Sequence, residues 1–184
     1  MFTRDPLARP EPLIRRVYAY AACRLGDGPD AEDATSETFE RALRYQKSYD
    51  PRKGEPLDWL IGIARRCVDE AFARPSPVPA SPETAAPGDL EEEAVRRAEL
   101  RTAVLRLEKR DRELIALRFG ADLTARQIAE LLGVRTNTIE VRLHRTLTRL
   151  RTVLERQAEP DVRVRTPARV LSSEAAERRP GRAA

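Results

Sequence analysis

A short basic stretch towards the C-terminal end of the chain carries side chains that suit the edges of DNA bases. If residues 136–154 form a helix with Ile139 and Leu143 turned inward, the outward face carries amide, imidazole, guanidinium and methyl groups. Arginine pairs with guanine, asparagine with adenine, a carboxylate with the cytosine amine and a valine methyl with thymine, while further arginines bind phosphates. The candidate DNA contacts are Arg135, Thr136, Asn137, Thr138, Glu140, Val141, Arg142, His144 and Arg145.

Two helices joined at a glycine are needed to hold that face, and the sequence predicts them. Thr124 is an N-cap with Gln127 at the capping-box position, Gly133 makes the turn, and Val134 plugs it. The second helix has an inward apolar stripe of Ile139, Leu143, Leu147, Leu150 and Leu154. This pattern predicts a DNA-binding helix-turn-helix. The alternatives are a helical hairpin with a solvated basic face and, for His144 alone, a surface histidine without a special role.

Another block with strong helical periodicity lies at residues 10–73. Gly26 ends a first helix, Asp30 is a suitable N-cap for a second, and Pro56 fits the first turn of a third. On the third helix, Trp59 and Arg66 lie opposite the apolar stripe, where an indole can stack on unpaired bases and a guanidinium can hold phosphate. The alternative is a central helix that is buried on all sides, with Trp59 in the core.

A segment rich in Pro, Ser and Ala, with an acidic end, separates the two blocks. Its composition is typical of a flexible linker, at residues 74–93, and the Arg-rich tail at 156–184 is predicted to be disordered. We therefore expect an all-α chain with two small helical domains, 10–73 and 94–155, each with a small core of its own.

The composition argues against several classes of protein. A net charge of +4 and a pI of about 9.4 permit a nucleic-acid partner without requiring one. A single histidine argues against a metal site, and the sequence has no nucleophile–base pair or Gly-rich phosphate loop that would predict an enzyme. Apolar runs fall short of the ~20 residues of a membrane span, and prolines interrupt the N-terminus where a signal peptide needs an apolar run. We expect a cytoplasmic protein with no cofactor.

Two motifs resemble the small bacterial RNA polymerase sigma factors of the extracytoplasmic-function group. The second conserved region of that family is similar to DAEDATSETFERAL at residues 30–43, followed by WLIGIARRCVDE from residue 59. The fourth region is similar to LEKRDRELIALRFGADLTARQIAELLGVRTNTIEVRLHRTLTRLR at residues 107–151. The order of the motifs, with a Pro-rich acidic linker between them, is strongly specific, and the resemblance covers roughly residues 13–154.

The resemblance implies a three-helix region 2 and a four-helix region 4 that bind core RNA polymerase and promoter DNA. It implies docking on the polymerase β′ coiled coil through Asp30, Asp33, Glu37 and Arg41. It implies capture of an unpaired −10 base by Tyr49, Arg52, Lys53, Trp59 and Arg66. Region 4 is implied to read the −35 duplex and to dock on the β flap. The resemblance is also compatible with an anti-sigma factor as a further partner.

Two departures from the usual residues of the family bear on promoter choice. Arg66 stands where the family often has asparagine, and Glu140 and Val141 replace a basic residue and a serine on the recognition helix. An acid on that face should weaken non-specific binding and shift the sequence preference. The main competing hypothesis is a helix-turn-helix regulator of the response-regulator type. Such a protein would need an upstream receiver or ligand domain, and the first block is purely helical.

Overall fold

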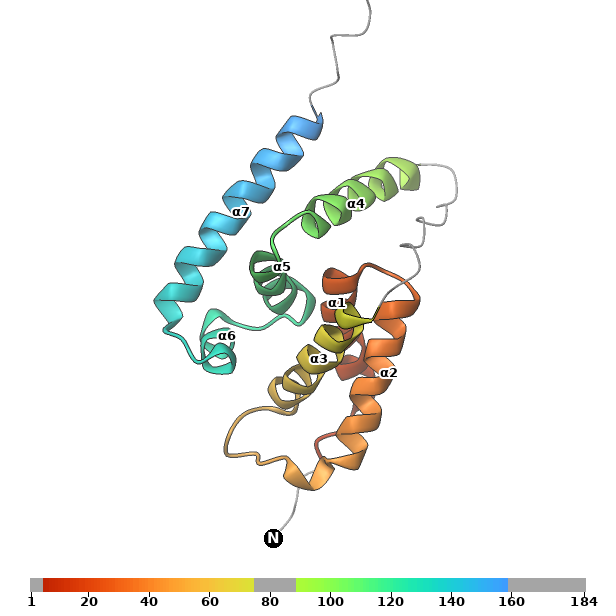
Figure 1. The fold of residues 1–184 in the computed structure, drawn as a ribbon, viewed down its shortest axis with the longest axis vertical. Coiled ribbons are helices and arrows are strands. Elements are labelled where there is room, and N and C mark those ends of the chain that lie inside the picture. Colours follow the sequence, from red (N-terminus) through yellow and green to blue (C-terminus); the bar gives the residue numbers. More distant parts are fainter. Residues whose placement is uncertain (1–4, 75–88, 159–184) are drawn as a thin grey trace, which may run out of the picture.

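The computed structural model describes residues 5–74 and 89–158, and every regular element in these ranges is a helix. The N-terminal half contains α1 (Pro10–Leu25), α2 (Pro29–Arg44), a 3-10 turn η1 (Gln46–Ser48) and α3 (Pro56–Ala73). The C-terminal half contains α4 (Asp89–Leu105), α5 (Lys109–Ile115), a π-helical turn η2 (Ala116–Gly120), α6 (Ala125–Leu132) and α7 (Thr136–Ala158). In Figure 1, α5 and α6 lie between the α1–α3 bundle and α7. The predicted all-α fold with a three-helix and a four-helix domain is confirmed.

The segment between the two domains is partly helical. Helix α4 begins at Asp89, ahead of the predicted domain start at residue 94, so the acidic end of the predicted linker forms the first turns of a helix. Helix α7 extends to Ala158, so the first residues of the tail predicted at 156–184 are helical and not disordered. The rest of the predicted linker, residues 75–88, and the rest of the predicted tail, 159–184, lie outside the described residues.

Proline sets the start of each helix in the N-terminal half. Pro10, Pro29 and Pro56 occupy first turns, where the missing N–H costs no helical hydrogen bond. The prediction that Asp30 is the N-cap of α2 is wrong, because Pro29 already occupies the first turn and Gly28, with φ of 141°, is the N-cap. Asp30 lies in that first turn, where its negative carboxylate is stabilised by the positive end of the helix dipole.

The buried side chains do not divide into one core for each half. The larger cluster joins Tyr20 and Leu60 of the α1–α3 bundle to Leu117, Ile128 and Ile139 of the C-terminal half, all with none of their surface exposed. A smaller cluster joins α4, α5 and α7 through Ala103, Val104, Leu107, Ile115 and Leu150. The expectation of a separate core in each domain is therefore wrong, because hydrophobic burial continues from one domain into the other.

Gly120 allows the two halves to approach each other closely. A Cβ atom at this position would lie 2.8 Å from the carbonyl oxygen of Ala19 and 2.9 Å from the Cα of Tyr20. Because these neighbours are backbone atoms of α1, which cannot rotate away, a side chain at residue 120 would push the η2 turn off α1. The seam between α1 and η2 therefore requires glycine.

Candidate nucleic-acid interface

The helix-turn-helix forms where the sequence predicts it. Thr124 caps α6: its Oγ1 accepts a hydrogen bond from the backbone N–H of Gln127 at 3.2 Å, and the Gln127 Oε1 accepts from the Thr124 N–H at 3.0 Å. Gly133 ends α6 in the left-handed conformation, with φ of 66°. Val134 was expected to plug the turn but is 38% exposed. The Thr124 cap thus fixes where α6 begins, and the Gly133 turn sets the angle between α6 and α7.

Helix α7 turns its polar face outward. Ile139 is fully buried and Leu143 nearly so, as predicted, but Leu147 is 40% exposed and Thr146 is buried in its place. Thr146 and Leu150 continue the buried stripe because, at 100° per residue, each lies within about 20° of Ile139 around the helix, whereas Leu147 lies about 80° away. Most candidate DNA contacts are exposed, with Thr136 and Thr138 half-buried: Arg135, Asn137, Glu140, Val141, Arg142, His144 and Arg145.

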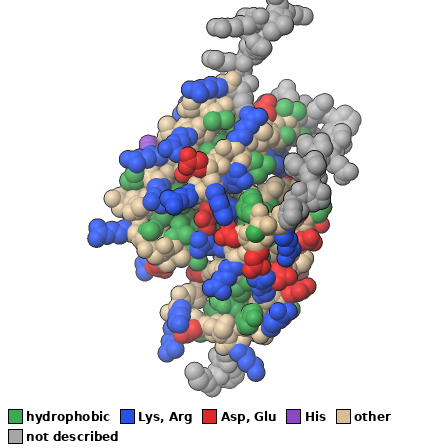
Figure 2. Space-filling view, in the orientation of Figure 1, with side chains coloured by type: hydrophobic (Ala, Val, Ile, Leu, Met, Phe, Trp, Pro, Cys, Tyr) green, Lys and Arg blue, Asp and Glu red, His purple; other side chains and the backbone are tan. Residues whose placement is uncertain are grey.

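Basic side chains collect on the edge that α7 presents. Figure 2 shows Lys and Arg side chains along the α6–α7 edge of this view, whereas Asp and Glu side chains gather over α2. Arg142 and Arg145 line a groove of about 430 Å³ between α5 and α7. Arg149 lines the same groove, but its guanidinium is 2.8 Å from the Asp111 carboxylate. The C-terminal half thus has a basic edge, of the kind that attracts phosphate, and the N-terminal half has an acidic one.

The loop between α2 and α3 is held in a defined shape by its own contacts. The Tyr49 hydroxyl donates to the Gly54 carbonyl at 3.1 Å, and the Tyr49 ring lies 5.6 Å from the Trp59 ring at 54°. Arg52 is paired with Asp50 at 3.1 Å, and this hydrogen bond from Arg52 lowers the pKa of the Asp50 carboxyl. The loop therefore presents an aromatic pair, and Arg52 is engaged within the loop itself.

The structure brings some of the candidate −10 residues together and leaves others apart. Tyr49, Lys53 and Trp59 line one cavity of about 240 Å³, while Trp59 and Arg66 line a neighbouring groove of about 760 Å³ between α2 and α3. Arg52 lines neither. Trp59 is half-buried and packs against the larger core cluster, which agrees in part with the core interpretation, and its role in stacking on a base stays a prediction.

The candidate docking residues lie along an acidic groove between α2 and α3. Asp30, Asp33 and Glu37 line this groove, which has a volume of about 410 Å³. Arg41 instead binds Glu70 of α3 through two hydrogen bonds of 2.9 and 2.6 Å, and Glu37 through a third of 2.6 Å. The hydrogen bonds to Glu70 and then Glu37 raise the pKa of Arg41, and the hydrogen bond from Arg41 lowers the pKa of Glu70. Arg41 thus ties α2 to α3.

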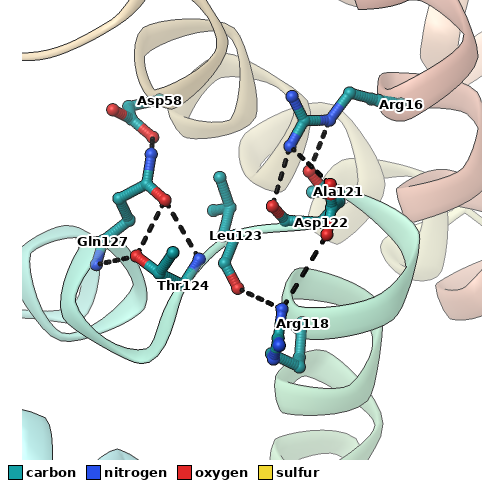
Figure 3. Close-up of polar contacts among 8 residues, drawn as sticks. All are labelled: Arg16, Asp58, Arg118, Ala121, Asp122, Leu123, Thr124 and Gln127. Carbon is teal, nitrogen blue, oxygen red and sulfur yellow. Dashed lines mark hydrogen bonds and ion pairs between the residues drawn. The ribbon is translucent and has the colours of Figure 1, made fainter.

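Sequence reasoning missed the part of α6 that faces the loop between α2 and α3. Gln127, Glu130 and Leu131 line the same cavity as Tyr49, Lys53 and Trp59. The Gln127 Nε2 donates to the Asp58 Oδ1 of α3 at 3.2 Å (Figure 3). The signal was hidden because Gln127 was fully explained by its place in the capping box of α6.

Two searches of the described ranges were negative. Residues 5–74 and 89–158 contain no group of three His, Cys, Asp or Glu side chains that could hold a metal ion. In the same ranges, no helix combines the length and the apolar character that crossing a membrane requires.

Comparison with known proteins gives the same two regions. Residues 11–74 match the family model for Sigma-70 region 2, and residues 97–150 match the model for Sigma-70 region 4. The ECF RNA polymerase sigma factor BldN of Streptomyces coelicolor is 33% identical over 146 residues, which are 73% of this chain and 55% of the length of BldN. The ECF RNA polymerase sigma factor SigK of Mycobacterium ulcerans is 31% identical over 150 residues, covering 76% of this chain and 80% of SigK.

A solved structure has the same fold. The sigma factor RpoE of Bartonella quintana, in complex with the anti-sigma factor NepR, superposes with a TM-score of 0.60 at 21% identity, over 79% of this chain and 93% of RpoE. At this identity the likeness concerns the fold alone.

Proposed function

The chain belongs to the sigma-70 family, in the extracytoplasmic-function group of RNA polymerase sigma factors, and on this premise we propose that it binds core RNA polymerase and directs it to specific promoters. Region 2, formed by α1–α3, reads the −10 element, and region 4, formed by α4–α7, reads the −35 element. The observation that carries the proposal is that one chain combines two surfaces of different kinds. One is a basic helix that suits duplex DNA, and the other is an aromatic loop that suits a single strand.

The −35 reader is the outward face of α7. Asn137, Val141, His144 and Arg145 are exposed on this face, with Glu140 beside them, and they are shaped to contact base edges in a major groove. The Gly133 turn between α6 and α7 fixes the angle of α7, which is what register on a duplex requires. Glu140 is the residue expected to make the preferred sequence unusual, because a carboxylate accepts from a cytosine amine and repels phosphate.

The −10 reader is the loop before α3 together with the first turns of α3. Trp59 and Tyr49 offer ring faces for an unpaired base, and Lys53 offers a cation for the adjoining phosphate. Opening a duplex costs stacking energy, and stacking a flipped base on an aromatic side chain offsets part of this cost. Arg66 lies in the adjacent groove, where it can contact the next phosphate along the strand.

The acidic groove of α2 supports docking on polymerase. Asp30, Asp33 and Glu37 give it a negative charge that suits a basic partner such as the β′ coiled coil, and such charges set orientation and association rate more than affinity. Region 4 docks on the β flap, and an anti-sigma factor is a further partner. The chain acts in the cytoplasm as a polymerase subunit and contributes no catalytic group of its own.

Reconstituted transcription tests this proposal directly. Purified protein added to core RNA polymerase should start transcription at specific genomic positions, which start-site sequencing would identify. Core enzyme alone should not start there. A protein that binds promoter DNA tightly by itself and never supports initiation with core enzyme would be a free-standing helix-turn-helix regulator, and the proposal would be wrong.

Arg145→Ala should relax selection at one base pair of the −35 element. Loss of a bidentate pair with guanine is expected to cost about 1–3 kcal/mol of discrimination at that position. Competition binding with a −35 duplex and its single-base variants measures this. Arg151→Ala is the matched control, because Arg151 is 81% exposed and paired with Glu155 farther along α7. A uniform loss across all sequences would instead identify Arg145 as a phosphate contact.

A further inference from the structure

The residues ahead of α1 bind the start of the loop between α2 and α3. The Asp5 Oδ1 accepts a hydrogen bond from the Gln46 Nε2 of η1 at 2.6 Å, across 41 positions of the chain. The same oxygen accepts from the Leu7 N–H at 2.8 Å. One carboxylate oxygen thus closes the turn before α1 and fastens this turn to η1. Figure 1 shows the start of the described chain at the end of the α1–α3 bundle that carries this loop.

Apolar contacts keep Asp5 in place. Pro6 is buried, and Leu7 packs against the larger core cluster. Because these contacts already order the segment, the exposed bond between Asp5 and Gln46 costs little further entropy. The segment precedes residues 11–74, the part of the chain that matches the family model for region 2. One partner of this contact therefore lies outside the matched region.

Gln46 also bonds to the tyrosine of the loop. Its backbone carbonyl accepts from the Tyr49 N–H at 3.2 Å at the end of the η1 turn. The Tyr49 hydroxyl donates to the Gly54 carbonyl at 3.1 Å, and the Tyr49 ring lies 5.6 Å from the Trp59 ring. Two hydrogen bonds, one from the side chain of Gln46 and one to its backbone, therefore connect Asp5 to the residue that forms the aromatic pair with Trp59.

The other end of the loop is held by α3. The Glu55 N–H donates to the Asp58 Oδ2 at 3.2 Å, in the capping box that begins this helix. Asp5 holds the opposite end, at η1. A loop that is fixed at both ends loses less conformational freedom when a ligand binds, and this preorganisation strengthens binding.

We infer that Asp5 is a positioning residue of the −10 reader, which binds Gln46 and so holds the Tyr49 ring beside Trp59 in the shape that receives an unpaired base. This inference rests on the proposed function. Asp5 lines neither of the cavities to which Trp59 contributes, so it acts through Gln46 and Tyr49 and not by touching the base. Its negative charge repels a DNA strand, so loss of the charge by itself should strengthen binding. The sign of the effect therefore separates positioning from charge.

Asp5→Ala should weaken binding of the −10 single strand by about two- to fivefold, the range expected when one hydrogen bond is lost. The probe is a fluorescent single-stranded DNA with the non-template −10 sequence of a promoter mapped by reconstitution, added to the protein assembled with core enzyme. A strand with the same bases in scrambled order gives the reference affinity. Asp5→Asn keeps the acceptor oxygen and removes the charge, so it should bind the strand at least as tightly as the wild type does.

Two further variants identify the bond as the cause. Gln46→Ala should weaken binding as Asp5→Ala does, and the double variant should bind no more weakly than either single variant, because both changes remove the same bond. Glu11→Ala is the matched control. Glu11 is an exposed acid in the first turn of α1, so its replacement removes the same charge, leaves the contact with η1 in place and should not weaken binding.

The protein without core enzyme gives a second readout. Trp59 is the sole tryptophan of the chain, so its fluorescence reports the aromatic pair directly. Asp5→Ala should raise the quenching of this fluorescence by acrylamide, because a loosened η1 lets the Tyr49 ring move away from Trp59. Binding of the −35 duplex and the urea midpoint of unfolding should stay close to those of the wild type.

An Asp5→Ala protein that binds the strand at least as tightly as the wild type would overturn the positioning role and leave the proposed function intact. So would an equal loss of binding in Asp5→Asn. A loss that is accompanied by a lower unfolding midpoint and weaker −35 binding would identify a purely structural residue and overturn the role as well. If the wild-type complex binds the −10 strand no more tightly than the scrambled strand, the proposed −10 function is wrong and the positioning role fails with it.

Discussion

Replacing Glu113 with glutamine should lower the free energy of unfolding by about 3–5 kcal/mol, the cost expected when one partner of a buried ion pair is neutralised. Arg24 is 1% exposed, and its Nη1 lies 3.6 Å from the Glu113 Oε1. The same carboxylate oxygen accepts from the Arg65 Nε at 2.7 Å. Glutamine keeps the shape of the side chain but removes the charge that two arginines share.

The carboxylate of Asp69 compensates only in part for a lost Glu113. Asp69 lies 3.3 Å from Arg24, but it is half-exposed and also pairs with Lys109 at 3.0 Å. Arg112 adds a further positive charge. Burial is the main reason that the pKa of Arg112 is lowered, and the nearby charge of Arg24 lowers it further. The Arg24 Nε has no hydrogen-bond partner among the described residues. Loss of Glu113 therefore leaves guanidinium groups close together with too little negative charge.

Urea unfolding measures this effect through Trp59 fluorescence, which reports region 2, and through far-ultraviolet circular dichroism, which reports both regions. Glu130→Gln is the control, since Glu130 is 64% exposed and its pair with Arg126 should contribute no more than about 0.5 kcal/mol. The double change Arg24→Met with Glu113→Leu should recover most of the loss, because well-packed apolar groups replace a buried ion pair at little cost. Equal stability of Glu113→Gln and Glu130→Gln would contradict the prediction.

The features that sequence predicted correctly are those that depend on a few neighbouring residues. The Thr124–Gln127 capping box, the Gly133 turn and the proline at the start of α3 each follow from contacts within about one helical turn. The outward face of α7 follows from helical periodicity once Ile139 is placed inside. Local chemistry therefore sufficed to identify the DNA-facing helix.

The features that sequence reasoning missed depend on which helices meet. Arg41 was expected on a docking surface, yet it donates two hydrogen bonds to Glu70, 29 positions away. The closeness of Gln127 to Asp58 likewise spans 69 positions. Contacts of this kind arise from tertiary packing, which the pattern within one helix does not encode.

Trp59→Leu should reduce binding of the −10 single strand by about 5- to 150-fold, which corresponds to the roughly 1–3 kcal/mol that stacking one base on an aromatic side chain contributes. Leucine preserves apolar contact with the core cluster against which Trp59 packs, but it has no ring face. Trp59→Phe keeps a ring and should lose much less. Tyr49 remains in both variants, but its ring lies 5.6 Å from that of Trp59 at a tilt of 54°, so it cannot replace the missing face.

The same variant separates the two explanations of Trp59, because region 4 is intact in it. A stacking residue predicts that Trp59→Leu binds the −35 duplex as the wild type does and unfolds at nearly the same urea concentration. If Trp59 is instead a core residue, Trp59→Leu should unfold at a lower urea concentration, and each folded molecule should bind the single strand as the wild type does. Trp59 is half-buried and lies between the core and two open cavities. Comparing the loss of single-strand affinity with the fall in the unfolding midpoint therefore shows how much this side chain contributes to DNA binding and how much to stability.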